Sequence, residues 1–229
     1  MFIELVDALR CVEPHEDSWL VLATRRMDGR TVVEGTLGCP VCRRSYTITG
    51  GVAYLGTAPG ESPSEDPAAR GAAPTEDDTM RLAALLDLTS PGGLVVLGGG
   101  WARHADAILD LAPVRLLLLD PTVPVARDDR LAPDGSVSVL RTGGGVVPLA
   151  AGAARAVALD DATVSDARLA AAARALAPGG RLVAPVGVGL PAHVRELARD
   201  GELWVAERER DGGASGGGAP VALRRARRE

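Results

Sequence analysis

Residues 94–102 read LVVLGGGWA: four apolar residues, three glycines and the beginning of an amphipathic stretch. The apolar run predicts a buried strand, and the stretch that continues to residue 111 predicts a helix. Glycines at such a turn let a ligand approach the backbone closely, and the amino terminus of the helix favours anionic or polar groups. Asp120 ends the next predicted strand, where a carboxylate can accept hydrogen bonds from both hydroxyls of a ribose. Together these residues predict a ligand site at the end of the first strand.

The sequence from residue 78 onward alternates between amphipathic and wholly apolar stretches. We expect helices at 78–88, 101–111, 164–176 and 192–199, and strands at 94–97, 115–119, 137–140, 156–159, 181–186, 203–208 and 220–224. Apolar strands that alternate with amphipathic helices are typical of a parallel sheet covered on both faces. The two strands after the last helix predict an antiparallel hairpin at the edge of that sheet.

The composition of the 229 residues excludes several kinds of chemistry. Hydrophobic residues make up 46%, but only six residues are aromatic, so the core must consist of Ala, Val and Leu. The chain contains no Lys, Asn or Gln, and all 25 basic residues are Arg. Without lysine there is no Schiff base and no Walker A lysine, and without Asn or Gln there is no bidentate recognition of adenine in a major groove.

The net charge of −5 is unevenly distributed, because residues 57–79 carry one Arg against six acidic residues. No broadly basic face is predicted, so the charge does not support binding of nucleic acid by the chain alone. No signal peptide and no apolar run of about 18 residues is found, so we expect no membrane span. Three cysteines, an odd number, argue against a disulfide framework. A cytoplasmic protein is therefore expected.

Residues 57–78 are rich in Pro, Gly and acidic residues, which is typical of a flexible linker. This linker divides a small module, residues 1–56, from a larger unit, residues 79–229. In the module, apolar residues at helical spacing predict a helix at 2–10. Two hairpins are expected after it, one from 19–24 and 31–33 and one from 45–49 and 52–55.

The cysteines of the small module have the spacing of a zinc site. A Cys-x-x-Cys pair between two hairpins can bind one tetrahedral ion, and a third cysteine and a histidine lie upstream. The predicted ligands are Cys11, His15, Cys39 and Cys42. Glu13 or Asp17 are alternatives to His15, and a reduced cysteine pair without metal is the alternative to zinc. A module of 56 residues has a marginal core, which a structural metal would stabilise.

Three segments of the small module resemble a known protein family. LVDALRC at 5–11, GTLGCPVC at 35–42 and SYTITGGVAYL at 45–55 are similar to the small zinc-ribbon subunit that activates RNA and protein methyltransferases. The resemblance implies a small α+β zinc-ribbon-like domain over residues 1–56. The chain departs from that family at His15, where a second cysteine is common, and some relatives have lost the metal.

The larger unit resembles the class I S-adenosylmethionine-dependent methyltransferases. The resemblance is carried by the glycine loop, by Asp120 and by AAARALAPGGRLV at 171–183, and it implies a Rossmann-like, mostly parallel sheet with an antiparallel last strand. By analogy, the residues that line the cofactor would be Gly98, Gly100 and Ala102, and Asp120 would bind its ribose. Asp160 and Asp161 would lie near the methyl acceptor as a base or metal ligands, or else cap the following helix.

The larger unit also departs from that family. Val96 and Gly143 stand where the family usually has acidic residues, and Ala154-Arg155 replaces a Phe-Asp pair. His104 is expected at the surface. Two functions follow: an S-adenosylmethionine-dependent methyltransferase with a cis-fused activator-like module and an unknown methyl acceptor, or a catalytically degenerate scaffold that binds a partner subunit. A nicotinamide-dependent oxidoreductase is ranked below both.

Overall fold

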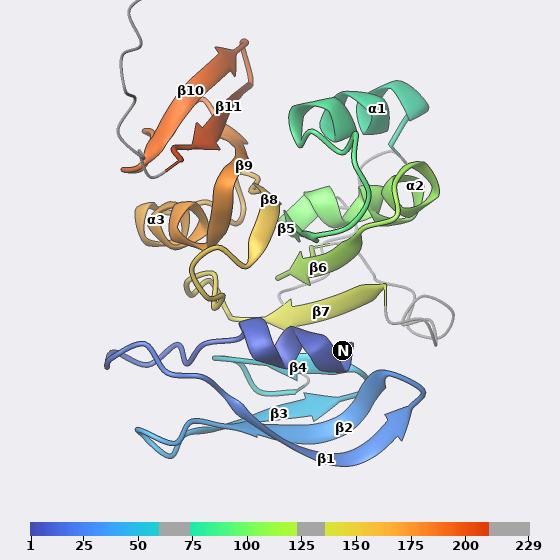
Figure 1. The fold of residues 1–229 in the computed structure, drawn as a ribbon, viewed down its shortest axis with the longest axis vertical. Coiled ribbons are helices and arrows are strands. Elements are labelled where there is room, and N and C mark those ends of the chain that lie inside the picture. Colours follow the sequence, from blue (N-terminus) through green and yellow to red (C-terminus); the bar gives the residue numbers. More distant parts are fainter. Residues whose placement is uncertain (60–73, 123–135, 211–229) are drawn as a thin grey trace, which may run out of the picture.

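The computed structural model describes residues 1–59, 74–122 and 136–210. The strands of these segments form one 11-stranded sheet, in the order β1-β2-β3-β4-β7-β6-β5-β8-β9-β11-β10 (Figure 1). The central strands are parallel and both ends of the sheet contain antiparallel pairs. The predicted α/β class, a Rossmann-like and mostly parallel sheet with an antiparallel end, is confirmed.

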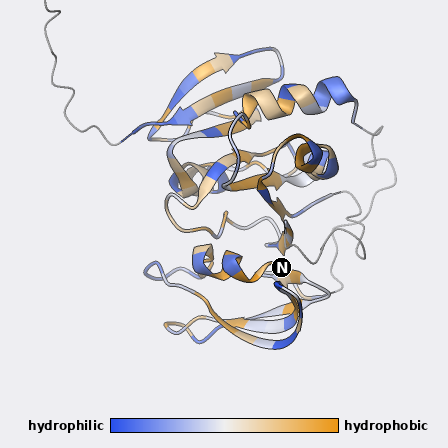
Figure 2. Cartoon of the chain, turned by 45° about the vertical axis from the view of Figure 1, so that its right-hand side comes forward, coloured by the Kyte–Doolittle hydropathy of each residue, from blue (hydrophilic) through white to orange (hydrophobic). Residues whose placement is uncertain are grey.

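The parallel core consists of strands that the apolar runs predicted. They are β5 (Leu94–Gly98), β6 (Arg115–Leu119), β7 (Val137–Arg141), β8 (Ala154–Ala158) and β9 (Leu176–Pro185). All residues of β5 are buried, because Val96 packs into one hydrophobic cluster and its neighbours Val95 and Leu97 pack into another on the opposite face. The hydropathy colours of Figure 2 show hydrophobic residues along these central strands.

Helices precede or follow the strands that lead to the predicted ligand site. They are α1 (Glu76–Leu85), the 3-10 helix η3 (Gly99–His104), α2 (Ala105–Leu111) and α3 (Asp166–Ala175). Thr75 forms a capping box with Asp78 at the start of α1, and the Ser165 hydroxyl accepts a hydrogen bond from the backbone N–H of Arg168 at the start of α3. No helix in the described part of the chain is long and apolar enough to cross a membrane.

The antiparallel end of the sheet differs from the prediction. Residues predicted as a helix at 192–199 form the strand β10 (Val194–Arg199), which pairs with β11 (Leu203–Arg208). The Asp200 carboxylate accepts hydrogen bonds from the backbone N–H groups of Glu202 and Leu203, which turns the chain back after only six residues. Pairing in the sheet therefore overrides the weak helical pattern. The strand predicted at 220–224 lies outside the described residues.

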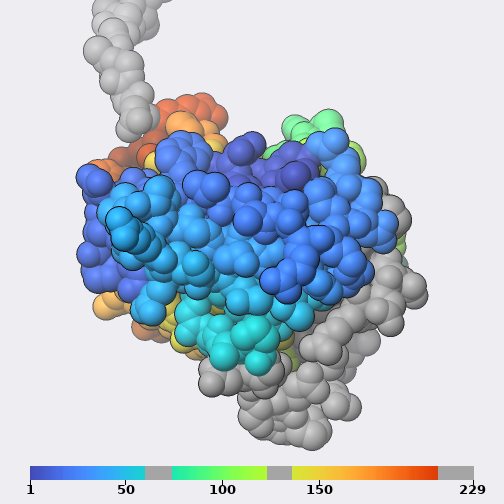
Figure 3. Space-filling model, turned by 90° about the horizontal axis from the view of Figure 1, so that it is seen from below, coloured from blue at the N-terminus to red at the C-terminus, as the bar shows by residue number. Residues whose placement is uncertain are grey.

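The N-terminal segment forms an antiparallel meander. It consists of η1 (Ile3–Ala8), β1 (Val21–Asp28), β2 (Thr31–Gly38), β3 (Ser45–Thr49) and β4 (Val52–Tyr54). The helix predicted at 2–10 is shorter, and it is a 3-10 helix. Seen from below, this segment covers one end of the molecule (Figure 3). Residues 60–73 of the predicted linker lie outside the described residues.

The N-terminal segment and the larger unit share one sheet and one core. Strand β4 pairs in parallel with β7, and the Phe2 backbone N–H donates a hydrogen bond to the Ser138 hydroxyl at 2.9 Å. The backbone N–H of Arg10 donates to the carbonyl of Pro148. Buried Leu5 and Leu9 belong to the same hydrophobic cluster as Leu140 and Leu149. The two units predicted from the sequence are thus joined by main-chain pairing and by apolar burial.

Candidate functional site

Four potential metal ligands meet at the edge of the N-terminal meander. The ligand atoms of Cys11, His15, Cys39 and Cys42 all lie within 4.8 Å of one another. Cys11 and His15 come from the segment between η1 and β1, and the other two come from the connection between β2 and β3. Three thiols and one imidazole form the donor set that Zn²⁺ prefers in tetrahedral sites.

Neighbouring groups prepare these side chains for a metal. The His15 Nδ1 lies 2.6 Å from the carbonyl oxygen of Glu16, so Nδ1 carries the proton and Nε2, 3.4 Å from Cys39 Sγ, is available to bind an ion. Burial acts to raise the pKa of Cys39, but the backbone N–H groups of Cys42 and Val41 donate to its sulfur and lower that pKa to about 6. These residues fit a structural zinc ion.

The alternative ligands are engaged elsewhere. The Glu13 carboxylate accepts a hydrogen bond from Arg44 Nε at 2.9 Å, and the Asp17 carboxylate lies 3.5 Å from Arg10 Nε. The geometry therefore favours His15 over either acidic residue as the fourth ligand.

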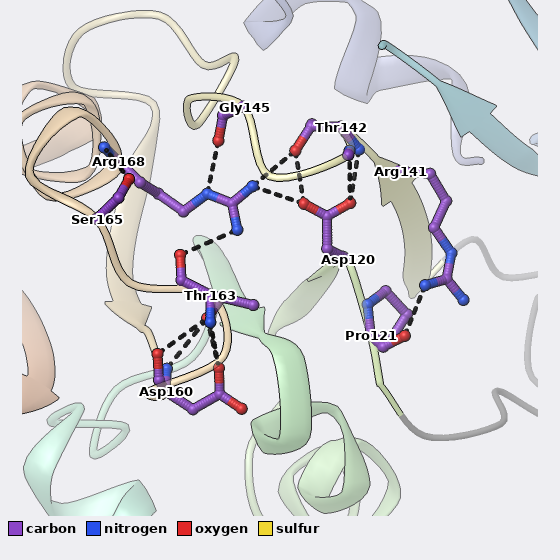
Figure 4. A network of polar contacts seen from close by, with 10 residues as sticks. Asp120, Pro121, Arg141, Thr142, Gly145, Asp160, Thr163, Ser165 and Arg168 are labelled. Atoms are coloured by element: carbon purple, nitrogen blue, oxygen red, sulfur yellow. Dashed lines mark hydrogen bonds and ion pairs between the residues drawn. The ribbon is translucent and has the colours of Figure 1, made fainter. Parts of the chain in front are cut away.

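The glycine loop after β5 is closed by a side chain of this protein. Gly99 has a positive φ of 59°, and a Cβ atom there would overlap the Asp160 carboxylate. One oxygen of that carboxylate accepts a hydrogen bond from the Gly100 backbone N–H at 2.7 Å, and the other accepts one from the Thr163 hydroxyl at 2.6 Å. Figure 4 shows Asp160 and Thr163 in contact beside this loop. Asp160 thus occupies the anion position at the start of η3.

Asp120 is buried and fully hydrogen-bonded within the protein. Its Oδ1 accepts hydrogen bonds from the backbone N–H groups of Thr142, at 2.6 Å, and Gly143, at 3.3 Å. Its Oδ2 accepts hydrogen bonds from the Thr142 hydroxyl and from Arg168 Nη2, both at 2.6 Å (Figure 4). A carboxylate has about four acceptor positions, so none remains for a ribose. Burial acts to raise the pKa of Asp120, but these bonds from Thr142 and the charge of Arg168 outweigh it and lower that pKa.

Arg168 connects the loops that follow three strands. Its side chain is 2% exposed, and besides Asp120 and Thr142 it donates from Nε to the Gly145 carbonyl at 2.6 Å and from Nη1 to the Thr163 carbonyl at 3.0 Å. Asp120 follows β6, Gly145 follows β7 and Thr163 follows β8. Sequence reasoning missed Arg168, and its only signal was a lone arginine on the Ala- and Leu-rich side of the predicted helix.

The predicted cofactor residues do not assemble around one cavity. A cavity of about 720 Å³ lies at this end of the sheet, and Gly100, Asp160 and Asp161 are among the described residues that line it. Gly98, Ala102 and Asp120 are buried and are not among them. With the acceptors of Asp120 used and the glycine loop capped by Asp160, these residues do not fit S-adenosylmethionine.

Two other residues that the sequence singled out occupy unexpected places. His104 is 1% exposed rather than at the surface, and its Nδ1 lies 2.9 Å from the Thr79 hydroxyl, which joins η3 to α1. Burial and the nearby Arg103 charge lower the pKa of His104 to about 4. Asp161 is exposed and has no hydrogen bond or ion pair to another described residue. Neither Asp160 nor Asp161 caps α3, because Ser165 does so.

Replacing Asp160 with alanine should lower the free energy of unfolding by about 1–3 kcal/mol, because the Gly100 N–H and the Thr163 side chain would lose their partner. Asp161→Ala is the matched control, since its exposed neighbouring carboxylate has no such bonds, and we expect a change within about 0.5 kcal/mol. Urea denaturation measures both. Equal losses in the two variants would contradict the capping role of Asp160.

Comparisons with known proteins concern the fold. No protein-family model matches the sequence, and no curated protein matches it. A solved structure of geranyl diphosphate methyltransferase with GPP and sinefungin is 19% identical, with a TM-score of 0.40, over 47% of this chain and 44% of that one. The complex of the Haloferax volcanii Trm112 methyltransferase activator and a methyltransferase is 16% identical, with a TM-score of 0.46, over 63% and 95%.

TrmN from Thermus thermophilus is 21% identical, with a TM-score of 0.44, and the match covers 64% of this chain and 53% of that one. This chain therefore spans about half the length of TrmN and of the geranyl diphosphate methyltransferase chain. The likeness of this chain to the three structures is one of fold alone.

Proposed function

We propose that this protein is a binding module with a methyltransferase-type fold, which holds a partner subunit and does not transfer methyl groups. The observation that carries this proposal is the Asp120 carboxylate, whose two oxygens accept four hydrogen bonds from Thr142, Gly143 and Arg168. A ribose would have to displace a buried, charged guanidinium that donates to four groups. Breaking such a pair costs several kcal/mol before any ligand contact forms.

We further propose that residues 1–56 are a zinc-ribbon-like module of the activator type, fused in cis. The Cys11, His15, Cys39 and Cys42 cluster would hold the zinc, which supplies structural cross-linking between two segments of the module. The main-chain pairing of β4 with β7 supports a stabilising role toward the larger unit. Because zinc-binding thiols must stay reduced, we also propose a cytoplasmic location.

A second candidate is an S-adenosylmethionine-dependent methyltransferase with an unknown acceptor. The strand order favours it. From β7 to the far edge, the sheet runs β7-β6-β5-β8-β9-β11-β10, which is 3-2-1-4-5-7-6 when β5 is counted as the first strand. The strand β11 is antiparallel to both of its neighbours, β9 and β10. This is the doubly wound order with one added strand, and the cavity beside Gly100 lies at its topological switch point. In such an enzyme the side chains of Arg168 and Asp160 would have to leave their present partners.

Calorimetric titration of the zinc-loaded chain with S-adenosylmethionine and S-adenosylhomocysteine separates the two candidates. A binding module should show no saturable heat with either compound. Micromolar binding that disappears in Asp120→Asn, but persists in the exposed control Asp110→Ala, would contradict the proposal and support the enzyme.

A further inference from the structure

Tyr46 lies directly beside one of the proposed zinc ligands. It belongs to β3, is 5% exposed, and its hydroxyl oxygen lies 3.2 Å from Cys11 Sγ. The nearby Cys42 Sγ lies 3.7 Å from the same sulfur. A tyrosine hydroxyl at the edge of a cysteine cluster can tune the metal that the cluster holds.

The direction of this hydrogen bond follows from the state of the sulfur. A zinc-bound cysteine is a thiolate and carries no proton, so the Tyr46 hydroxyl must be the donor. A tyrosine hydroxyl carries its proton at neutral pH and can therefore donate it to the sulfur, which lies 3.2 Å away. The contact is therefore a charge-assisted O–H to thiolate bond, a stronger kind than a bond between neutral groups.

The three sulfurs differ in how their charge is stabilised. A zinc ion with three thiolates and one neutral histidine has a formal charge of −1. Cys39 accepts backbone N–H bonds, and Cys42 is exposed to water. Cys11 is partly buried, and apart from the backbone of Glu13 its donor is Tyr46. Among the described residues, Tyr46 is the side chain whose hydroxyl is hydrogen-bonded to a sulfur of the cluster, that of Cys11.

We propose that Tyr46 is a positioning residue for the metal: its hydroxyl orients the Cys11 sulfur and stabilises that residue's thiolate form, which raises the affinity of the cluster for zinc. This inference rests on the proposed zinc site and adds a residue outside the four ligands. Partners of this kind contribute roughly 10- to 100-fold in metal affinity.

The test is Tyr46→Phe, which removes only the hydroxyl, and the matched control is Tyr54→Phe on β4, the other tyrosine of the chain. Competition with the chromophoric chelator 4-(2-pyridylazo)resorcinol measures zinc affinity. We expect Tyr46→Phe to bind zinc roughly 10-fold more weakly or worse, and Tyr54→Phe to match the wild type. In the cobalt-substituted protein, the thiolate-to-cobalt charge-transfer band should move to lower energy in Tyr46→Phe alone, since its sulfur has lost a donor.

A second measurement keeps the proposal testable if Tyr46→Phe does not fold. In the Tyr54→Phe background, 3-fluorotyrosine replaces Tyr46 alone and makes its hydroxyl a stronger donor, so the cobalt band should move to higher energy. Unchanged zinc affinity and an unmoved band in these variants would overturn the role of Tyr46 while the zinc site stands. A wild-type protein that binds neither zinc nor cobalt would overturn the zinc site and this inference together.

Discussion

Replacing Arg168 with alanine is expected to lower the free energy of unfolding by about 3–5 kcal/mol, the usual cost of leaving one partner of a buried ion pair alone. The Asp120 carboxylate would keep its charge without its 2.6 Å contact to Arg168 Nη2. The carbonyl oxygens of Gly145 and Thr163 would also lose their donors. Urea denaturation of the zinc-loaded chain measures the change.

Arg174→Ala is the matched control, because Arg174 lies on the same helix α3 but is exposed. We expect its loss to stay within about 0.5 kcal/mol. The double variant Asp120→Ala/Arg168→Ala should recover part of the stability that Arg168→Ala loses, because no unpaired charge stays buried. A single variant Arg168→Ala as stable as Arg174→Ala would show that the network does not hold the strand ends together.

The same network sets a dependence on pH. Because hydrogen bonds and Arg168 lower the pKa of Asp120 below its ordinary value of about 4, this carboxylate contributes stability that is fully present above that ordinary value. The contribution is lost as the pH falls through the lowered pKa of the folded state. The difference in stability between the wild type and Arg168→Ala should therefore shrink at acidic pH, once Asp120 is protonated.

Removing zinc should unfold the N-terminal module cooperatively. Structural zinc contributes about 10–16 kcal/mol to small domains that fold only with metal. The meander here is joined to the larger unit through β4 and β7. After chelation, the backbone amides of β2 and β3 should therefore be at least tenfold less protected, as measured by hydrogen exchange. The amides of the segment 148–150 should also lose protection, because this segment is bonded to the module. The backbone N–H of Ala150 donates to the carbonyl of Ala8, and the backbone N–H of Arg10 donates to the carbonyl of Pro148.

The control for zinc removal is restoration by zinc but not by magnesium, since magnesium prefers oxygen ligands. Strand β8, which lies between β5 and β9 and away from the meander, should keep its protection throughout. Unchanged exchange in β2 and β3 after complete chelation would contradict a structural role for the metal.

Local pattern predicted the strands and helices whose burial is strongest. The run at 94–97 was found because all of its residues are apolar, and the helix at 164–176 because one of its faces is. The cysteine cluster was also predictable, since the Cys39 and Cys42 spacing already suits one ion. That the sulfur and nitrogen atoms converge was confirmed by the geometry, whereas the presence of zinc stays a prediction.

Other features depend on contacts between distant residues. The parallel pairing of β4 with β7 joins residues 52–54 to 139–141, and no local pattern signals it. The local pattern at 192–199 predicted a helix. The segment forms strand β10 instead, because its pairing with β11 outweighs its own helical preference. The burial of His104 depends on a hydroxyl 25 residues away, and the bond between Arg168 and Asp120 joins residues 48 apart.

The central claim, that the chain's own side chains fill the cofactor position, is tested most directly by nuclear magnetic resonance. The ¹⁵N-labelled, zinc-loaded protein would be titrated with S-adenosylhomocysteine while the backbone amide of Gly100 and the Nε of Arg168 are observed. Both groups donate directly to the network, to Asp160 and to Gly145. We predict that neither resonance moves even with a large excess of ligand. A saturable shift of both would show that Asp160 and Arg168 yield to the cofactor, and would contradict the account.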